Sequence, residues 1–354
     1  MSFSLFLILF HFVAPIQALL NPKSSNISAI YVFGDSTVDP GNNNYINTIF
    51  RSNFQPYGRD FPNQVPTGRF SNGRIPTDFI ASYLGIKEFV PPYLDKSLSM
   101  EDLMTGVSFA SAGTGYDPFT AQLSHVIEMP TQLEYFREYR TKLVNAIGTN
   151  RTDDHIHNSV AVISCGTNDF IVNYFALPIR QKTYDVASYR QFLLRNFRQL
   201  IQGLWDLGIR KFVVGGLPPM GCLPEVITSR HEFIRRECVT TYSLAAREFN
   251  QNLQDELVAM QNIFKLHRGL IVYADIYGPL TDLIQNPQKY GFEETSRGCC
   301  GSGLLEASFA CGPNSLVCSD ASKYVFWDAI HPSERAYYFV STSFHGIINL
   351  FIKH

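Results

Sequence analysis

Three side chains that could carry out acyl transfer stand beside apolar segments at opposite ends of the chain. Ser36 lies in the GDST sequence at 34–37, and His331 follows Asp328 by three residues. A serine hydroxyl is a weak nucleophile near neutral pH and needs an adjacent base. An imidazole can accept and return that proton, and a carboxylate can hold its tautomer. We predict Ser36 as the nucleophile, His331 as the base and Asp328 as the group that orients it.

Donors for a tetrahedral oxyanion follow two other apolar segments. Gly113, in SAGTG, offers a backbone N–H with no side chain in the way, and Asn168, in GTND, offers a side-chain amide. The backbone N–H of Ser36 is a third donor. Because acyl transfer needs donors already aimed at the developing charge, we predict an oxyanion hole at these three positions.

Each of these residues also has an ordinary structural interpretation. A serine in such a turn is often a helix cap, a glycine provides backbone freedom, and an Asn-Asp pair favours a turn. Their joint order along the chain favours catalysis. No GxSxG surrounds Ser36, and no GxGxxG or Walker loop follows the first apolar run, which disfavours an α/β-hydrolase elbow and nucleotide binding.

The elements that must position these residues form an alternating pattern. Helical patterns at 189–207 and 232–266 lie among short apolar runs, which predicts an α/β protein with a parallel sheet covered on both faces. Ligands of such sheets bind beyond the carboxyl ends of the strands. The predicted strands are 29–34, 106–110, 159–166, 211–216 and 269–274. The expected apolar stripe of the second helix is Phe233, Val239, Leu244, Phe249, Leu253, Leu257 and Ile263.

Composition and charge exclude some classes of protein. The 354 residues carry 29 basic and 31 acidic side chains, a net charge of −2, so no overall field attracts nucleic acid or an anionic membrane. We find no internal repeat and no linker, and expect one domain over 27–354.

The N-terminus predicts export. Residues 1–18 are apolar and end at the small residue Ala18, as in a secretory signal peptide, although Lys and Arg are absent before the apolar run. A membrane anchor is the alternative. We expect a secreted, extracellular protein without stable membrane insertion, and glycosylation at the sequons of Asn26 and Asn150.

The chain has seven cysteines, four of them in the Gly-rich stretch 298–318. Export favours disulfides, and no histidine lies among the clustered cysteines, so we expect disulfides rather than a metal site. Because disulfides use cysteines in pairs, an odd number of cysteines leaves one of them unpaired. We predict that it is Cys165, buried in a strand, while the pairing of the other six stays open among 15 possibilities.

Four blocks of sequence resemble the GDSL esterase/lipase family, also called SGNH hydrolases, and in particular its secreted plant branch and the extracellular lipase subgroup. The blocks are VFGDSTVDPGNNNY, VSFASAGTGYD, ISCGTNDF and VFWDAIHPSE, and the connecting stretches YGRDFPNQVPTGRFSNGRIPTDFIA and GLPPMGCLP are also similar. In this resemblance the catalytic serine falls on Ser36, the oxyanion residues on Gly113 and Asn168, and the remaining catalytic pair on Asp328 and His331.

The resemblance implies a three-layer α/β/α flavodoxin-like fold with a five-stranded parallel sheet, and hydrolysis of carboxylic esters without cofactor or metal. Two positions depart from the family pattern. Thr37 stands where the family usually has Leu, and Ser108 stands where it commonly has Asn. We expect Thr37 to have only a local packing effect, and Ser108 to leave the geometry of the Gly113 turn less well defined.

The expected substrate is an ester of a small molecule, a lipid or a cell-wall polymer, and the expected state is a monomer. Two alternatives stay open: an acyltransferase that uses the same site, and a catalytically silent secreted binding protein. Residues 42–73 and 298–318 are long enough to form the rim of the site.

Overall fold

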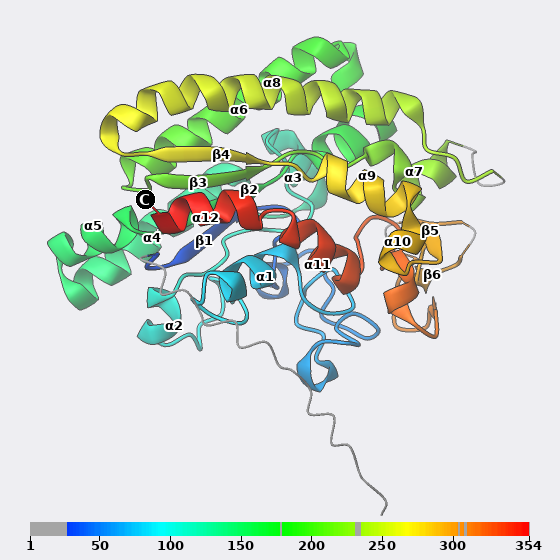
Figure 1. The fold of residues 1–354 in the computed structure, drawn as a ribbon, viewed down its shortest axis with the longest axis horizontal. Helices are drawn as coiled ribbons and strands as arrows, with labels where there is room; N and C mark the ends of the chain where they lie inside the picture. Colours follow the sequence, from blue (N-terminus) through cyan, green and yellow to red (C-terminus); the bar gives the residue numbers. More distant parts are fainter. Residues whose placement is uncertain (1–26, 178, 231–234, 304, 308–309, 354) are drawn as a thin grey trace, which may run out of the picture.

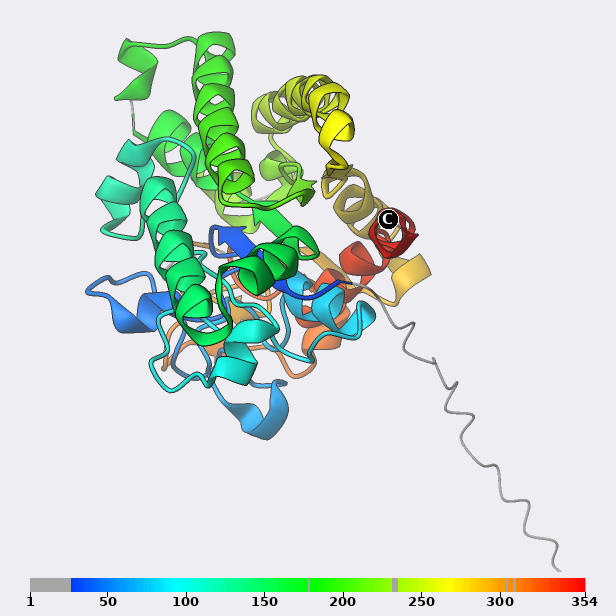
Figure 2. The same cartoon turned by 90° about the vertical axis from the view of Figure 1, so that its left-hand side faces the viewer.

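A parallel β-sheet between two layers of helices forms the centre of the protein (Figure 1). The computed structural model describes residues 27–177, 179–230, 235–303, 305–307 and 310–353. The predicted signal peptide and Asn26 lie outside these residues. Helices α4, α6 and α8 cover one face of the sheet, and α1, α11 and α12 cover the other, as the end-on view in Figure 2 shows.

The sheet has four hydrogen-bonded parallel strands in the order β1-β2-β3-β4. Buried Val, Ile, Phe and Tyr side chains dominate these strands, as expected for a sheet covered on both faces. The first and last residues of each strand lie within two residues of the predicted bounds. The strands are β1 (Ile30–Gly34), β2 (Val160–Ser164), β3 (Lys211–Gly215) and β4 (Leu270–Ala274).

The expectation of a fifth regular strand at 106–110 is wrong. That segment runs beside β1, where the Val32 N–H donates to Val107 O and the Phe109 N–H donates to Val32 O. Only Ser108 forms a bridge to Val32, and its other side pairs with the short turn at Pro92. Hydrogen bonds to β1 continue on both sides, from the Ile30 N–H to Thr105 O and from the Ser111 N–H to Gly34 O, but the positive φ of Gly106, +96°, interrupts the extended backbone. The segment still occupies the fifth position, which preserves the flavodoxin-like order.

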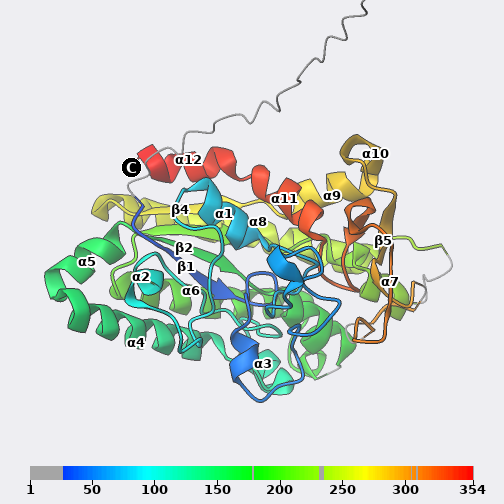
Figure 3. The same cartoon turned by 90° about the horizontal axis from the view of Figure 1, so that it is seen from below.

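The remaining elements surround this sheet, and Figure 3 shows α1, α11 and α12 from below. In the described part of the chain, no helix combines the length and apolarity needed to cross a bilayer. The helices are α1 (Pro76–Tyr83), α2 (Met100–Met104), α3 (Pro118–Ser124), α4 (Met129–Ile147), α5 (Thr149–His157), α6 (Val186–Asp206), α7 (Pro224–Ser229), α8 (Thr240–Phe264), α9 (Tyr277–Gln285), α10 (Pro287–Tyr290), α11 (Glu334–Thr342) and α12 (His345–Lys353). Short 3-10 or π segments are η1 (Asn42–Tyr45), η2 (Pro62–Gln64), η3 (Asp169–Ala176), η4 (Arg180–Lys182), η5 (Met220–Cys222), η6 (Lys265–His267) and η7 (Ala321–Lys323). The short strands are β5 (Glu294–Gly298), β6 (Cys300–Gly301), β7 (Leu316–Val317) and β8 (Tyr324–Phe326).

Helix α8 begins eight residues later than predicted, at Thr240. Cys238 is tied to Cys222 by a disulfide, and the Val239 N–H donates to Gly221 O, so the chain before Thr240 is held against η5. The helix then buries one face against the sheet.

The predicted apolar stripe of α8 is only partly right. Phe249, Leu253 and Leu257 are buried as expected, whereas Leu244 and Ile263 are 44% and 61% exposed. Leu244 lies five residues before Phe249, which turns it away from the buried face. Val239 is half-buried at the start of the helix, and Phe233 lies outside the described residues.

Three disulfides are present: Cys222–Cys238, Cys299–Cys318 and Cys300–Cys311. Cys165 is unpaired and buried, which confirms the prediction for that residue. Two of the bridges close the segment 299–318, which we call the disulfide lobe. The Cys299 and Cys300 N–H groups donate to Phe326 O and Trp327 O, so the lobe is fastened to the chain directly before Asp328.

Candidate active site

Ser36, His331 and Asp328 form one hydrogen-bonded row. His331 Nε2 lies 2.7 Å from Ser36 Oγ, and His331 Nδ1 lies 2.8 Å from Asp328 Oδ2 and 2.9 Å from Oδ1. All three side chains are buried. The imidazole is therefore bonded to a carboxylate on one nitrogen and to a hydroxyl on the other.

A tight turn after β8 sets the spacing between Asp328 and His331. Asp328 Oδ1 accepts the backbone N–H groups of Ile330 at 2.8 Å and His331 at 2.7 Å. Ser333 then caps α11, its hydroxyl accepting the Ala336 N–H. Burial would raise the pKa of Asp328, but the charge of His331 and the N–H donors outweigh it and leave that pKa below its ordinary value. Asp328 is thus held as a carboxylate.

Ser36 follows β1 in a loop that is fixed by Asp35. The Thr37 N–H and hydroxyl donate to Asp35 Oδ1 at 3.0 and 2.8 Å, and Thr37 Oγ1 lies 2.9 Å from Ser164 Oγ at the end of β2. Burial raises the pKa of Asp35 to about 6, although the Thr37 donors and His331 oppose the shift. Thr37 therefore makes polar contacts in addition to the packing role expected for it.

Gly113 lies in a turn that requires glycine. Its φ is +89°, and a Cβ at this position would lie 3.2 Å from Ser124 Cβ and 3.5 Å from the Phe50 ring. A side chain would be both strained and crowded there. The turn is closed by the Thr114 N–H, which donates to Ser111 O.

Asn168 reaches the same turn from β2. It precedes η3, is half-buried, and its Nδ2 donates to Thr114 O at 2.9 Å. The next residue, Asp169, accepts the N–H groups of Tyr116 and Asp117 at 2.8 and 3.1 Å. Asn168 and the Gly113 turn are therefore joined by direct hydrogen bonds.

Three polar residues that the sequence analysis did not single out brace the turn against the Ser36 loop. Asp39 Oδ1 accepts the Asn42 N–H at 2.7 Å, and its Oδ2 accepts the Ala112 N–H at 2.9 Å. Asn43 Nδ2 donates to Ala112 O at 2.9 Å. Asn42 Nδ2 donates to Ser108 O and Ala110 O. The run DPGNNN was a signal for these contacts, because Asp and Asn commonly bond nearby backbone groups.

Ser108 contributes to the same bracing. Its hydroxyl donates to Val38 O at 3.0 Å and accepts the Ala110 N–H at 3.2 Å. The serine thus links the segment before the Gly113 turn to the loop after Ser36.

The two predicted rim segments meet in a small aromatic core beside the triad. Tyr57 and Phe70 come from 42–73, and Trp327 lies next to the disulfide lobe. The Tyr57 hydroxyl donates to Asp328 Oδ2 at 2.8 Å, and the Phe70 ring centroid is 4.9 Å from that of His331. No pattern in the sequence pointed to the Tyr57 contact.

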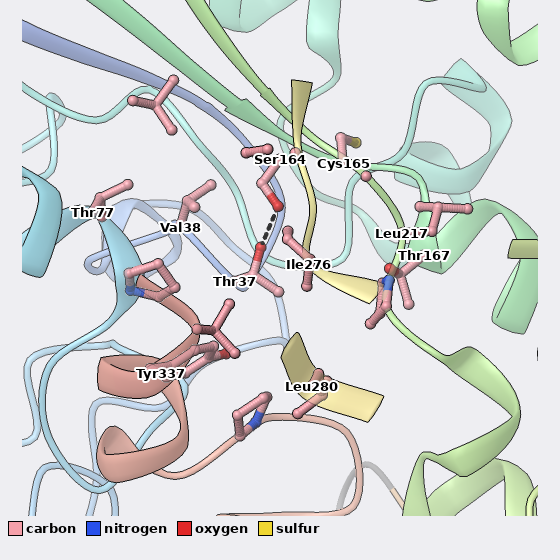
Figure 4. A pocket seen from close by; sticks show the side chains of 18 of the residues that line it. Thr37, Val38, Thr77, Ser164, Cys165, Thr167, Leu217, Ile276, Leu280 and Tyr337 are labelled. Atoms are coloured by element: carbon pink, nitrogen blue, oxygen red, sulfur yellow. Dashed lines mark hydrogen bonds between the residues drawn. The ribbon is translucent and has the colours of Figure 1, made fainter. Parts of the chain in front are cut away.

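A small apolar cavity of about 70 Å³ lies behind the site, between the carboxyl ends of the strands and α11. Figure 4 shows Thr37 and Ser164 bonded to each other at its wall. Ser36 and His331 themselves do not line it, so the cavity borders the site without reaching its reactive atoms. In the described residues no group of His, Cys, Asp and Glu is arranged to hold a metal ion.

Comparison with known proteins identifies the family of the chain. The family model for GDSL-like lipase/acylhydrolase matches residues 30–343. One GDSL esterase/lipase of Arabidopsis thaliana is 55% identical over 319 residues, covering 89% of this chain and 85% of the relative. Two others from the same plant are 44% identical, each covering 92% of this chain and 91% of the relative. The chain therefore belongs to the GDSL-like lipase/acylhydrolase family and is an ester-hydrolysing enzyme.

Proposed function

We propose that the enzyme hydrolyses carboxylic esters through an acyl-enzyme intermediate on Ser36. His331 is the general base and Asp328 orients it. The distance of 2.7 Å between His331 Nε2 and Ser36 Oγ carries the proposal, because proton transfer requires hydrogen-bond reach.

The reaction follows from these contacts in two halves. Ser36 Oγ attacks the ester carbonyl carbon while its proton passes to His331 Nε2. The oxyanion is held by the N–H groups of Gly113 and Ser36 and by the Asn168 amide. His331 then protonates the departing alcohol oxygen. Water, deprotonated by the same imidazole, attacks the acyl carbon and releases the acid, with Ser36 recovering its proton.

Asp328 acts throughout by electrostatics and orientation. Its carboxylate faces Nδ1, which leaves Nε2 free to accept the Ser36 proton, and its negative charge stabilises the imidazolium that forms. The lowered pKa of Asp328 supports this role, because the carboxylate stays charged at neutral and mildly acidic pH.

We also propose that the mature enzyme acts outside the cell as one hydrolase domain over 27–354, after loss of residues 1–18. Three disulfides support an oxidising compartment. Asn150 is exposed at the start of α5, which suits a glycosylated residue. The substrate class is an ester of a small molecule, a lipid or a cell-wall polymer.

A panel of esters tests the proposed function. Wild type, Ser36→Ala and the control Ser188→Ala, an exposed serine on α6, are compared on esters from acetylated glycans to long-chain acyl esters. We expect Ser188→Ala to behave as wild type and Ser36→Ala to be inactive while keeping its circular dichroism spectrum. Turnover of any ester by Ser36→Ala at the wild-type rate would refute the assignment.

A further inference from the structure

One buried tyrosine outside the triad is bonded to it directly. The Tyr57 hydroxyl lies 2.8 Å from Asp328 Oδ2, one of the two oxygens within hydrogen-bond distance of His331 Nδ1. Both Tyr57 and Asp328 are 2% exposed, so water has almost no access to either. This hydrogen bond therefore replaces solvent at one end of the catalytic row.

The donors to Asp328 divide between its two oxygens. Oδ1 accepts the N–H groups of Ile330 and His331 from its own turn. At Oδ2, His331 Nδ1 shares the acceptor with Tyr57 alone among the side chains that the structure describes. Without Tyr57, this oxygen of a buried carboxylate would depend on the imidazole alone, which is costly for a charged group.

The ring of Tyr57 is held in place from three sides. Its centroid lies 5.5 Å from that of Phe54, 5.7 Å from Phe70 and 6.2 Å from Trp327, with edge-to-face geometry in each case. Burial and the adjacent Asp328 carboxylate raise the pKa of Tyr57 well above its ordinary value, so the hydroxyl keeps its proton. A fixed ring with a protonated hydroxyl can only be a donor here.

We propose that Tyr57 is a positioning residue for the triad, which aims the Asp328 carboxylate at His331 and disperses part of its negative charge. This inference rests on the proposed function. By accepting a hydrogen bond from Tyr57, Oδ2 gives up some of the electron density that would otherwise stabilise the imidazolium formed in the reaction. The pH dependence of kcat/KM should therefore change when the Tyr57 hydroxyl is removed.

Other titratable groups also face the pair and enter the interpretation of its pH dependence. Asp35 after β1 interacts with His331, and Glu306 of the disulfide lobe and Tyr337 of α11 interact with Asp328. Tyr337 provides a matched control. It is buried near the same carboxylate, yet its hydroxyl has no hydrogen-bond partner within the described ranges.

The experiment compares the pH dependence of kcat/KM for wild type, Tyr57→Phe and Tyr337→Phe on one p-nitrophenyl ester. For Tyr57→Phe we expect the acidic limb of the kcat/KM pH profile, where activity falls with decreasing pH, to move to higher pH by roughly half a unit or more. We also expect kcat to fall about 10-fold, because a hydrogen bond to a charged group is lost. For Tyr337→Phe the acidic limb should stay in place.

Two further variants separate the possible outcomes. In an Asp328→Asn background, Tyr57→Phe should leave the residual kinetics unchanged, since the two residues act as one unit. A Tyr57→Phe enzyme that loses thermal stability but keeps the wild-type limb would overturn the inference and leave Tyr57 structural. Full activity of Ser36→Ala would instead overturn the proposed function itself. If Tyr57→Phe does not fold, Phe54→Leu, which removes one of the rings that hold Tyr57, should shift the acidic limb in the same direction, and an unmoved limb there would count against the inference.

Discussion

His331 Nε2 and Ser36 Oγ lie 2.7 Å apart although 295 residues separate them in the chain. Ser36 lies in the loop after β1, and His331 lies shortly before α11. The parallel sheet places the loop after β1, which carries Ser36, at the carboxyl ends of its strands. Helix α11 packs against α1, and this contact brings the segment with His331 to the same edge. Most of the chain must therefore fold before the two side chains can meet.

Asn168 bonds the Gly113 turn through its side-chain amide, the group we propose as an oxyanion donor. Asn168→Ala should lower kcat/KM by about 10²–10³, or about 2.7–4 kcal/mol of transition-state stabilisation, if its amide is a principal oxyanion donor. Asn196→Ala is the matched control, because Asn196 Nδ2 donates from α6 to Tyr116 O, just after the Gly113 turn. Equal losses in the two variants would make Asn168 a brace of the turn and remove it from the oxyanion hole.

Gly113→Ala should damage both stability and turnover. A residue with a side chain at φ +89° costs about 1–3 kcal/mol, and here the new Cβ also presses on Ser124. Gly148→Ala is the control, since Gly148 has a φ of +82° but nothing within 4 Å of the added Cβ. Thermal unfolding and kcat are measured for both. We expect both to lose stability and only Gly113→Ala to lose kcat; an unchanged kcat in Gly113→Ala would argue against the turn as an oxyanion donor.

Thr37→Leu restores the residue usual in the family and should leave the chemistry intact. The new side chain enters the apolar cavity behind the site, while the hydroxyl bonds to Asp35 and Ser164 are lost. Because the Thr37 hydroxyl opposes the upward shift in the pKa of Asp35, that pKa should rise above its value of about 6. Steady-state kinetics check the first point and a pH-dependent thermal melt the second. A loss of turnover as large as that of Ser36→Ala would show that Thr37 takes part in the reaction.

The buried carboxyl of Asp169 makes stability depend on pH. Burial raises its pKa from 3.8 to about 8, despite the Thr120 hydroxyl and the backbone donors. The folded state thus holds a proton that the unfolded state releases, and the stabilisation is complete below pH 3.8 and lost as pH rises towards 8. The difference in unfolding free energy between wild type and Asp169→Asn, measured in urea across this range, should shrink as pH rises. A constant difference would contradict the shifted pKa.

Much of the sheet and the site could be predicted because each predicted residue follows a distinct apolar run. Val, Ile and Phe at 30–34 and 160–164 identify two strands, and parallel packing brings Ser36 and Asn168 to one edge. The unpaired Cys165 followed from the same reasoning, although the residue lies directly after β2 and not within it.

The failures have physical causes that lie in tertiary contacts. The segment 106–110 has the composition of a strand, but Gly106 has a φ of +96° and only Ser108 forms bridges, one to Val32 and one to Pro92. The start of α8 depends on which cysteine Cys238 pairs with, and spacing alone does not determine this. Tyr57 is one of 18 tyrosines, and only the folded loop reveals that its hydroxyl reaches Asp328.

Mapping the adduct of a fluorophosphonate probe shows which serine is the nucleophile. The probe reacts with an activated serine, and peptide mass spectrometry identifies the residue that carries the phosphonyl group. We expect one adduct, on the peptide that contains Ser36, with labelling that is slowed strongly in His331→Ala. An adduct on a different serine, or undiminished labelling of Ser36 without His331, would contradict this expectation.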